Sequence, residues 1–165
     1  PESAQIAIES ALTGHLVIST LHTNDAPSAL TRLLEMGIEP FLIASAMDCV
    51  SAQRLARKLC ERCKEPIQQE EKLLTEIGFP MDKDTVFYRS VGCPSCNNTG
   101  FRGRIGVFEI LRVSEDIEKL VAKNAPHVEI AKLAREEGMK TLKEDGYEKV
   151  RVGATSLEEG LSVIM

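Results

Sequence analysis

Two pairs of cysteines constrain the fold of this chain more than any other feature of its sequence. Cys60 and Cys63 form a C-E-R-C motif, and Cys93 and Cys96 form a C-P-S-C motif. Two residues between the cysteines of a pair let both sulfurs reach one metal ion, so the two pairs supply the four thiolates of a tetrahedral zinc site. The 29 residues between the pairs exceed the roughly 15–20 of a compact zinc ribbon. The motifs therefore predict an inserted zinc-binding subdomain over residues 60–100.

Two other uses of these cysteines stay open at the level of sequence, namely two disulfides or two redox-active pairs. Five cysteines are an odd number, which suits a reducing compartment better than a secreted disulfide-bonded protein. Redox C-x-x-C motifs occur singly at a helix start, and two of them in a polar segment fit poorly. Four thiolates fill the coordination sphere of zinc, so we expect a structural ion and not a catalytic one. Cys49 lies outside the pattern, and we expect it to be a buried core residue.

The overall composition bounds the class of protein. At 165 residues, 43% of them hydrophobic, the chain has enough apolar side chains for a core. Its formal net charge of −5 argues against a nucleic-acid-binding protein, which usually has a basic surface. No run of about eighteen apolar residues occurs, so we expect no membrane-spanning helix.

The pattern of the first third of the chain is typical of an α/β protein. Residues 4–12 have the periodicity of an amphipathic helix. Residues 15–21 form an apolar, β-branched run that predicts a strand buried on both faces of a parallel sheet. Asn24 or Asp25 can cap a helix that follows. Residues 49–59 fit a helix and a strand equally well, and periodicity alone does not decide between them.

The segment after the second cysteine pair predicts one strand and then several helices. Residues 101–113 alternate as a strand does, with Val107 and Glu109 on one face. A capping box from Thr155 to Glu158 predicts the start of the last helix. The earlier helices are predicted to begin near Ser114, Pro126 and Met139. The C-terminal third should therefore contain a small helical bundle.

Polar residues follow the predicted strand 15–21 and form a second candidate site. In open α/β sheets, ligands bind beyond the carboxyl ends of the strands, and Thr20, His22 and Thr23 stand at that end. Their side chains can hydrogen-bond a phosphate oxygen or a metal-bound water. A lone histidine is more often structural, but its polar neighbours favour a binding role here. His15, at the other end of the strand, has no such neighbours and is interpreted as structural.

Arginines gather in two places, at Arg54, Arg57 and Arg62 and again at Arg102 and Arg104. One interpretation is that they compensate the negative charge of a zinc–thiolate centre. The other is contact with phosphate or with a neighbouring subunit, because the guanidinium fork suits phosphate.

Several motifs in a fixed order resemble those of a known family. They are T-G-H-L-V-I-S-T-L-H-T-N, M-G-I-E-P-F, A-Q-R-L-A-R-K-L-C, G-C-P-S-C-N-N-T-G-F-R-G-R-I-G-V-F-E and T-S-L-E-E. With these motifs, nearly the whole chain resembles the C-terminal half of the secretion ATPases that drive type II secretion and type IV pilus assembly. The tetracysteine insert favours an assembly or export motor over a pilus-retraction motor.

The resemblance implies an α/β fold with three parts. Residues 1–59 would be the C-terminal half of a RecA-like P-loop NTPase core, residues 60–100 the tetracysteine zinc insert, and residues 101–165 a return strand with a C-terminal helical bundle. It also implies a cytoplasmic homo-hexamer, peripheral to the inner membrane, that uses ATP and Mg²⁺. Hydrolysis would move the subunits against one another and push an inner-membrane platform protein, with no nucleic acid as a partner.

The resemblance further implies roles for single residues. His22 matches the family's histidine box at the γ-phosphate end of the site, and Glu2 matches the acidic residue after the Walker B strand, so both are expected to be catalytic. The residues expected to bind nucleotide are Thr20, Thr23, Arg32 and Arg104. The residues that match the family's zinc ligands are Cys60, Cys63, Cys93 and Cys96.

One departure from the family pattern limits what this chain can do. No G-x-x-x-x-G-K-[ST] loop occurs in the sequence, and a Walker B strand is also missing. We therefore expect a fragment whose missing parts lie upstream of Pro1. Without a phosphate cradle it should not hydrolyse ATP by itself. The alternative is a zinc-stapled interaction module without chemistry that binds protein or nucleic acid, and the acidic charge and the predicted strand count against it.

Overall fold

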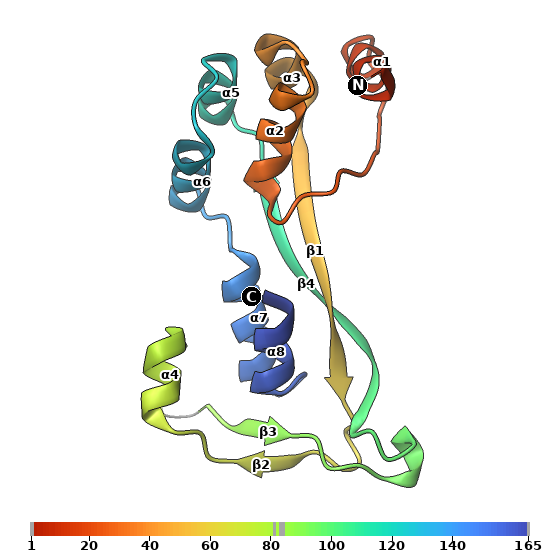
Figure 1. Ribbon diagram of the computed structural model, residues 1–165, viewed down its shortest axis with the longest axis vertical. Helices are drawn as coiled ribbons and strands as arrows, with labels where there is room; N and C mark the ends of the chain where they lie inside the picture. Colours follow the sequence, from red (N-terminus) through yellow and green to blue (C-terminus); the bar gives the residue numbers. More distant parts are fainter. Residues whose placement is uncertain (1, 81, 83–84, 165) are drawn as a thin grey trace. The chain divides into compact units, whose positions relative to one another are not determined.

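Helices and strands follow one another along residues 2–80, 82 and 85–164, which the computed structural model describes (Figure 1). The α-helices are α1 (Glu2–Leu12), α2 (Ala26–Glu35), α3 (Pro40–Ala46), α4 (Glu71–Ile77), α5 (Glu115–Ala122), α6 (His127–Glu136), α7 (Leu142–Arg151) and α8 (Leu157–Ile164). The strands are β1 (Cys49–Leu59), β2 (Glu65–Ile67), β3 (Phe87–Arg89) and β4 (Phe101–Arg112), and a 3₁₀ turn, η1, spans Pro94–Cys96.

Two strands that are far apart in the sequence, β1 and β4, pair with each other and lie side by side in Figure 1. At one end of the ladder, the N–H of Cys60 donates to the carbonyl of Gly100 over 2.9 Å. At the other end, the N–H of Val113 donates to the carbonyl of Asp48, also over 2.9 Å. The strands are therefore antiparallel. This pairing assigns residues 49–59, which the sequence left open, to a strand.

The chain forms two compact units, each built from two separate stretches. The first unit contains the residues up to Ala52 together with Glu109–Thr141, and the second contains Gln53–Phe108 together with the residues from Leu142 onward. These boundaries do not coincide with the three ranges expected from the sequence. Helices α5 and α6 belong with α1, α2 and α3, whereas α7 and α8 belong with the cysteine segment.

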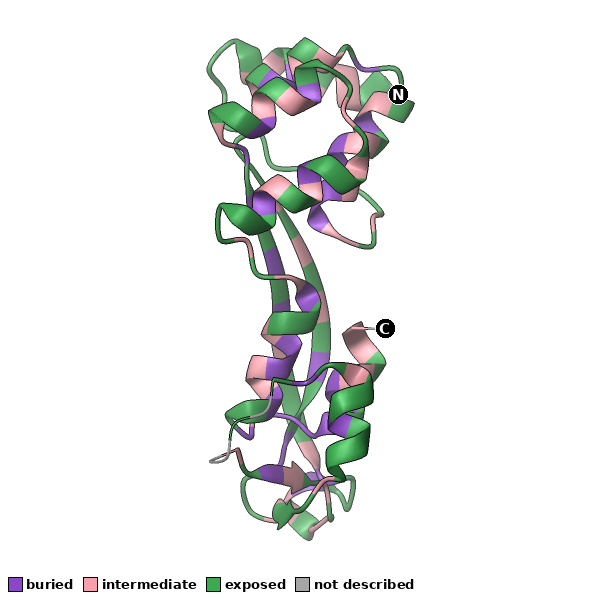
Figure 2. Ribbon diagram, turned by 90° about the vertical axis from the view of Figure 1, so that its left-hand side faces the viewer, coloured by how far each residue is buried: buried purple, intermediate pink, exposed green. Residues whose placement is uncertain are grey.

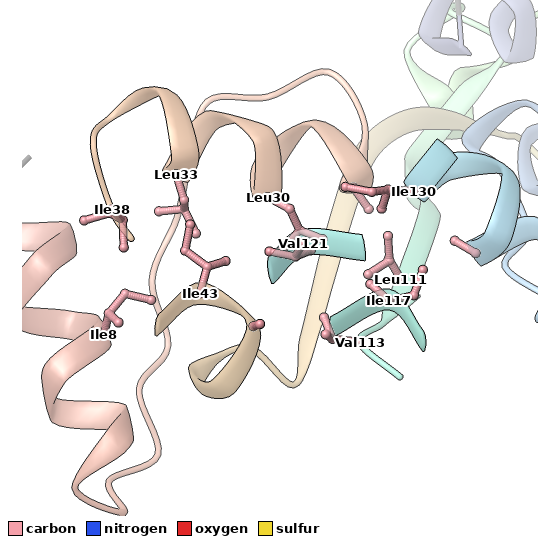
Figure 3. Close-up of a cluster of buried hydrophobic side chains, with 13 residues drawn as sticks. Ile8, Leu30, Leu33, Ile38, Ile43, Leu111, Val113, Ile117, Val121 and Ile130 are labelled. Atoms are coloured by element: carbon pink, nitrogen blue, oxygen red, sulfur yellow. The ribbon is translucent and has the colours of Figure 1, made fainter. Parts of the chain in front are cut away.

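The first unit has a continuous apolar core between its helices and the end of β4 (Figure 3). Two of its helices begin as predicted. The Asp25 carboxylate accepts the Ser28 N–H over 2.8 Å at the start of α2, and the Ser114 hydroxyl accepts the Ile117 N–H over 3.2 Å at the start of α5. The core residues are Ile8, Ala26, Leu30, Leu33, Ile38, Ile43, Ala44, Leu111, Val113, Ile117, Val121, Ile130 and Ala134.

The prediction of a buried strand at residues 15–21 is wrong. This segment connects α1 to α2 without regular structure, and Leu16 and Ile18 are 86% and 87% exposed. Among the described residues, the sheets contain only β1 with β4 and β2 with β3, so no strand pairs with this segment. Because a strand is stabilised by ladder bonds and cross-strand packing, an apolar run without a partner does not form one. Cys49, predicted to be buried, is likewise exposed at the start of β1.

The second unit encloses a smaller core that the cysteine segment shares with α7 and α8 (Figure 2). Helix α4 ends at Gly78, which has the left-handed conformation expected of a C-terminal stop. Next to it the rings of Phe79 and Tyr147 contact each other at a tilt of 48° with centroids 4.8 Å apart, and the Tyr147 hydroxyl donates to the Ile77 carbonyl over 2.7 Å. The buried members of this core are Leu74, Phe79, Phe87, Tyr147, Val150 and Leu157.

The four C-terminal helices do not form the single bundle that was expected, because they divide between the two units. The apolar stripes of α5 and α6, with Ile117, Val121 and Ile130, enter the core of the first unit. Those of α7 and α8 cover the short strands of the cysteine segment. Helix periodicity predicts which face of a helix is apolar, but not which neighbour covers it.

A carboxylate on α8 holds the end of β1. Glu159 accepts the backbone N–H of Arg57 over 2.8 Å and the Nε–H of the same residue over 2.9 Å, and the Thr155 hydroxyl donates to the Arg57 carbonyl over 2.8 Å. The N-cap predicted at Thr155 is instead at Ser156, one residue later, and the Glu159 carboxylate binds Arg57 and does not close a capping box. Ser156 caps α8 by accepting the Glu159 N–H over 3.3 Å. The Arg57 guanidinium holds the pKa of the Glu159 carboxyl below its usual range, although burial opposes this shift.

Neighbouring residues on opposite faces of β4 give a matched test of the core. Leu111 is fully buried whereas Ile110 is 55% exposed. We expect Leu111→Ala to lower the free energy of unfolding by about 2–5 kcal/mol, because it removes buried methyl groups and leaves a cavity. Ile110→Ala should change it by less than about 1 kcal/mol. Urea denaturation followed by circular dichroism measures both, and equal effects would contradict the burial described here.

Candidate functional site

The four cysteines of the two C-x-x-C motifs meet at one point of the second unit. Their sulfur atoms all lie within 4.8 Å of one another. The Sγ–Sγ distance is 3.9 Å between Cys60 and Cys93, 3.8 Å between Cys63 and Cys96, and 3.8 Å between Cys93 and Cys96. The structure thus brings together the four residues that the spacing alone had grouped.

The same local turn positions both cysteine pairs. The Cys60 carbonyl accepts the N–H of Cys63 over 3.1 Å and that of Lys64 over 2.9 Å. In the second pair, the Cys93 carbonyl accepts the N–H of Cys96 over 3.1 Å and that of Asn98 over 2.9 Å. Each turn therefore directs two sulfur atoms to the same side of the backbone.

Further contacts join the two turns. The Arg62 guanidinium donates to the Ser95 hydroxyl over 2.7 Å. Gly100 has a φ of +75°, and a Cβ at that position would lie 2.5 Å from the Ser90 Cβ, so only glycine fits. Gly100 also accepts the Cys60 N–H at the end of the β1–β4 ladder.

Backbone N–H groups surround the sulfur of Cys96. The N–H groups of Cys93 and Gly100 both donate to it over 3.2 Å. Burial alone would raise the pKa of Cys96, but these donors favour the thiolate and lower the pKa to about 6. Burial raises the pKa of Cys63 to about 12, since it lies among the other sulfurs without a comparable set of donors. The surroundings of the cluster therefore favour the thiolate of Cys96 and the thiol of Cys63.

The cluster fits a zinc ion. A Zn–S bond of about 2.3 Å in a tetrahedron gives an S–S edge of about 3.8 Å, close to the three distances above. A set of four sulfur donors favours zinc over the hard cations calcium and magnesium. Four thiolates would leave no coordination position for water, so a zinc ion held here would supply structure and not hydrolysis.

The polar segment proposed as a second site lies in the first unit, between α1 and α2. Thr20 and His22 are exposed and Thr23 is half-buried, and none of the three lies in a strand. The segment ends at Asp25, the N-cap of α2. The structure therefore places these residues close together in the chain but not at the carboxyl end of a sheet.

The other predicted site residues lie apart from this segment in the sequence and carry separate contacts. Glu2 is exposed in the first turn of α1. Arg32 pairs with Glu35 on the surface of α2 over 2.9 Å. Arg104 is exposed on β4, in the second unit. The grouping of these three residues with His22 as one site stays a prediction.

A glutamate and a histidine that contact the start of α2 were missed as site residues. Glu109, only 4% exposed, accepts the Ala26 N–H over 2.7 Å, and His127 of α6 lies 3.2 Å from the Asp25 carboxylate. The sequence did contain a signal for Glu109, because the alternation of β4 places a charged residue on the face of Val107. A charge at a buried position needs a partner, but the sequence does not show which one.

These carboxylates decide what the start of α2 can bind. The first N–H of a helix normally offers a site for anions. Here Glu109 occupies the Ala26 N–H, Pro27 has none, and Asp25 occupies the Ser28 N–H. A phosphate therefore does not fit at this helix start, and the described residues form no phosphate cradle of their own.

None of the helices in the described part of the chain has the length and the apolar character that crossing a bilayer requires.

Comparison with known proteins gives the class of protein to which this fold and cysteine cluster belong. The family described as "Type II/IV secretion system protein" matches residues 1–162. The chain is a member of this family.

Individual relatives are equally informative. Over 161 residues the chain is 46% identical to the type IV pilus assembly ATPase PilB of Myxococcus xanthus, covering 96% of this chain and 28% of that protein. Over 166 residues it is 45% identical to the type II secretion system ATPase E of Vibrio cholerae, covering 98% of this chain and 32% of that protein. The chain thus spans about a third of the length of these relatives.

Among solved structures, the chain resembles the pilus retraction motor PilT, determined with bound ADP. The TM-score is 0.63 at 19% identity, and the match covers 98% of this chain and 36% of the other. At this identity the likeness shows a shared mixed α/β fold and nothing about ligands.

Metal analysis tests the cysteine cluster directly. We expect one zinc ion per chain, and we expect Cys60→Ser to lose it on dialysis against a chelator, because three thiolates bind more weakly than four. Cys49→Ser is the matched control and should keep its zinc, since Cys49 lies outside the cluster. Retention of the full metal content in Cys60→Ser would contradict the assignment.

The two shifted pKa values predict how acid competes with the metal. Cys63, with a pKa of about 12, must release a proton to the solvent at any pH near neutrality when the metal binds, whereas Cys96, with a pKa of about 6, releases one only at lower pH. Apparent zinc affinity should therefore fall as the pH falls. Below about pH 6 the binding of one zinc ion should release about one proton more than it does above that pH, so the fall becomes steeper. Chelator competition between about pH 5 and 8 measures the slope, and a constant slope would refute the prediction.

Proposed function

We propose that this chain is part of an ATP-hydrolysing motor subunit that powers type IV pilus assembly or type II protein secretion. The observation that carries the proposal is the family match over residues 1–162, together with relatives about 45% identical that are named as ATPases of these two machines. The identities to the pilus and the secretion relatives are almost equal, so they do not favour either machine.

In this proposal the motor is a homo-hexamer in the cytoplasm, on the inner membrane, and acts on a membrane platform protein of its machine. The ATPase names of the relatives support the use of ATP and Mg²⁺ by the longer protein. The chain contributes part of a RecA-like core, in which His22 and Glu2 act on the nucleotide and Thr20, Thr23, Arg32 and Arg104 bind it. The family resemblance supports these roles.

In the same proposal, the zinc ion is structural and cross-links the insert. Three S–S distances of 3.8–3.9 Å support it, as does the small core that the insert shares with α7 and α8. A segment that builds only part of a core gains stability from a metal cross-link. The ion would thus hold the insert in shape while the chemistry takes place elsewhere.

The described residues do not by themselves hold a nucleotide. The sequence has no phosphate-binding loop, and carboxylates occupy the N–H groups at the start of α2. The backbone cradle, the lysine and the Mg²⁺ ligand must then come from another part of the longer protein. The role of this chain is to bring His22 to that cradle.

A pair of histidine substitutions tests the proposal in the longer protein. We expect His22→Ala to lower ATP turnover by roughly 100-fold while nucleotide binding persists, because a donor to the transferred phosphoryl group acts mainly in the transition state. His15→Ala is the matched control in the same segment and should keep turnover within about twofold. A coupled ATPase assay and fluorescent-nucleotide titration measure the two properties.

Two outcomes would contradict the proposal. Unchanged turnover in His22→Ala would reduce this histidine to a surface residue. Turnover by the purified chain alone, free of contaminants, would show that the described residues suffice for phosphoryl transfer.

A further inference from the structure

We propose that Glu109 and His127 are positioning residues that anchor the His22 segment at the start of α2. The inference rests on the proposed function for its catalytic consequence, but its structural content stands on contacts within the first unit. Neither residue belongs to the site derived from the sequence.

The segment that carries His22 has few fixed points. Among the described residues, no hydrogen bond between backbone groups involves residues 16–23. Before it, the His15 N–H donates to the Ser10 carbonyl over 3.3 Å at the end of α1. After it, the chain is held at Asp25 and Ala26. His22 lies three residues from this second anchor and seven from the first, so the contacts at Asp25 and Ala26 define its position.

Glu109 is the stronger half of the second anchor. Its carboxylate comes from β4, 83 residues further along the chain, and accepts the Ala26 N–H over 2.7 Å. The side chain is almost fully buried, and so is Ala26. Because donor and acceptor are both buried, losing this hydrogen bond leaves a buried N–H unsatisfied.

His127 supplies the other half from α6. Its Nε2 lies 3.2 Å from the Asp25 Oδ1, the same atom that accepts the Ser28 N–H. Burial alone would raise the pKa of Asp25, but the hydrogen bonds from Ser28 and His127 lower it, so the carboxylate stays ionised at neutral pH. Asp25 is thus fixed by α2 and α6 together.

The Asp25 carboxylate accepts the Ser28 N–H, which is a local cap that α2 can form with its own neighbouring residues. Glu109 from β4 and His127 from α6 add contacts that such a local cap does not need. Together they fix Ala26 and Asp25, which follow the His22 segment, to two elements remote in sequence, and this is how a reactive side chain on a loop is held within the narrow tolerance that catalysis requires.

The first experiment needs no enzymatic activity. Backbone ¹⁵N relaxation and amide exchange are recorded for the 165-residue chain and for Glu109→Ala, Glu109→Gln and His127→Ala. In Glu109→Ala we expect the Ala26 amide to exchange at least about tenfold faster and the order parameters of residues 20–25 to fall. Glu109→Gln keeps an oxygen acceptor and should restore most of both. His127→Ala removes a half-exposed side chain and should lower the order parameters without unfolding the unit.

Glu159→Ala is the matched control, because Glu159 is also a buried carboxylate that accepts a backbone N–H, but in the second unit. It should leave the order parameters of residues 20–25 unchanged. If Glu109→Ala and His127→Ala also leave them unchanged, the anchor is refuted. If all three variants lower them equally, the effect is a general loss of stability, and the anchor is refuted as well.

The second experiment measures catalysis in the longer protein. We expect Glu109→Ala to lower kcat by about tenfold or more with KM for ATP within about threefold, and Glu109→Gln to recover most of the loss. If kcat is unchanged in Glu109→Ala while His22→Ala is impaired, the positioning role is overturned. If His22→Ala is also unimpaired, the proposed role of the segment fails, and the contacts of Glu109 are structural only.

Discussion

The convergence of four sulfur atoms is the constraint on which the second unit depends. Four thiolates 3.8–3.9 Å apart would repel one another, so a fully deprotonated cluster needs a cation at its centre. The cluster lies where the β1–β4 ladder ends, beside the bond from Cys60 to Gly100. The described residues between its two halves form two three-residue strands and a seven-residue helix. A metal at this point would close the loop and leave α7 and α8 to complete its core.

The helix caps and the cysteine cluster were the predictable part of the structure. Asp25 and Ser114 cap their helices as expected, because a cap is encoded by a residue and its immediate neighbours. The cysteine cluster was predictable for the same reason, since each cysteine pair forms one local turn. Whether residues 49–59 form a helix or a strand could be decided only from their pairing with β4.

The failures concern partners that are distant in the sequence. An apolar run at residues 15–21 shows only that its side chains avoid water, and no described strand pairs with it. The division of the C-terminal helices between two units depends on which apolar faces they meet. Glu109 was visible as a charge on a buried face, but its acceptance of the Ala26 N–H joins residues 83 positions apart. For the same reason, the grouping of Glu2, Arg32 and Arg104 with His22 stays a prediction.

The interleaving of the two units has a consequence for synthesis on the ribosome. The first unit has all of its residues once Thr141 has been made, whereas the second needs α7 and α8, which follow. Chains emerge from the N-terminal side and begin to fold before they are finished. The cysteine segment is therefore synthesised before half of the buried residues of its core, among them Tyr147 and Leu157, have been made. A metal ion captured at this stage would give the nascent insert its shape and keep Leu74 and Phe87 near their final neighbours until the last two helices arrive.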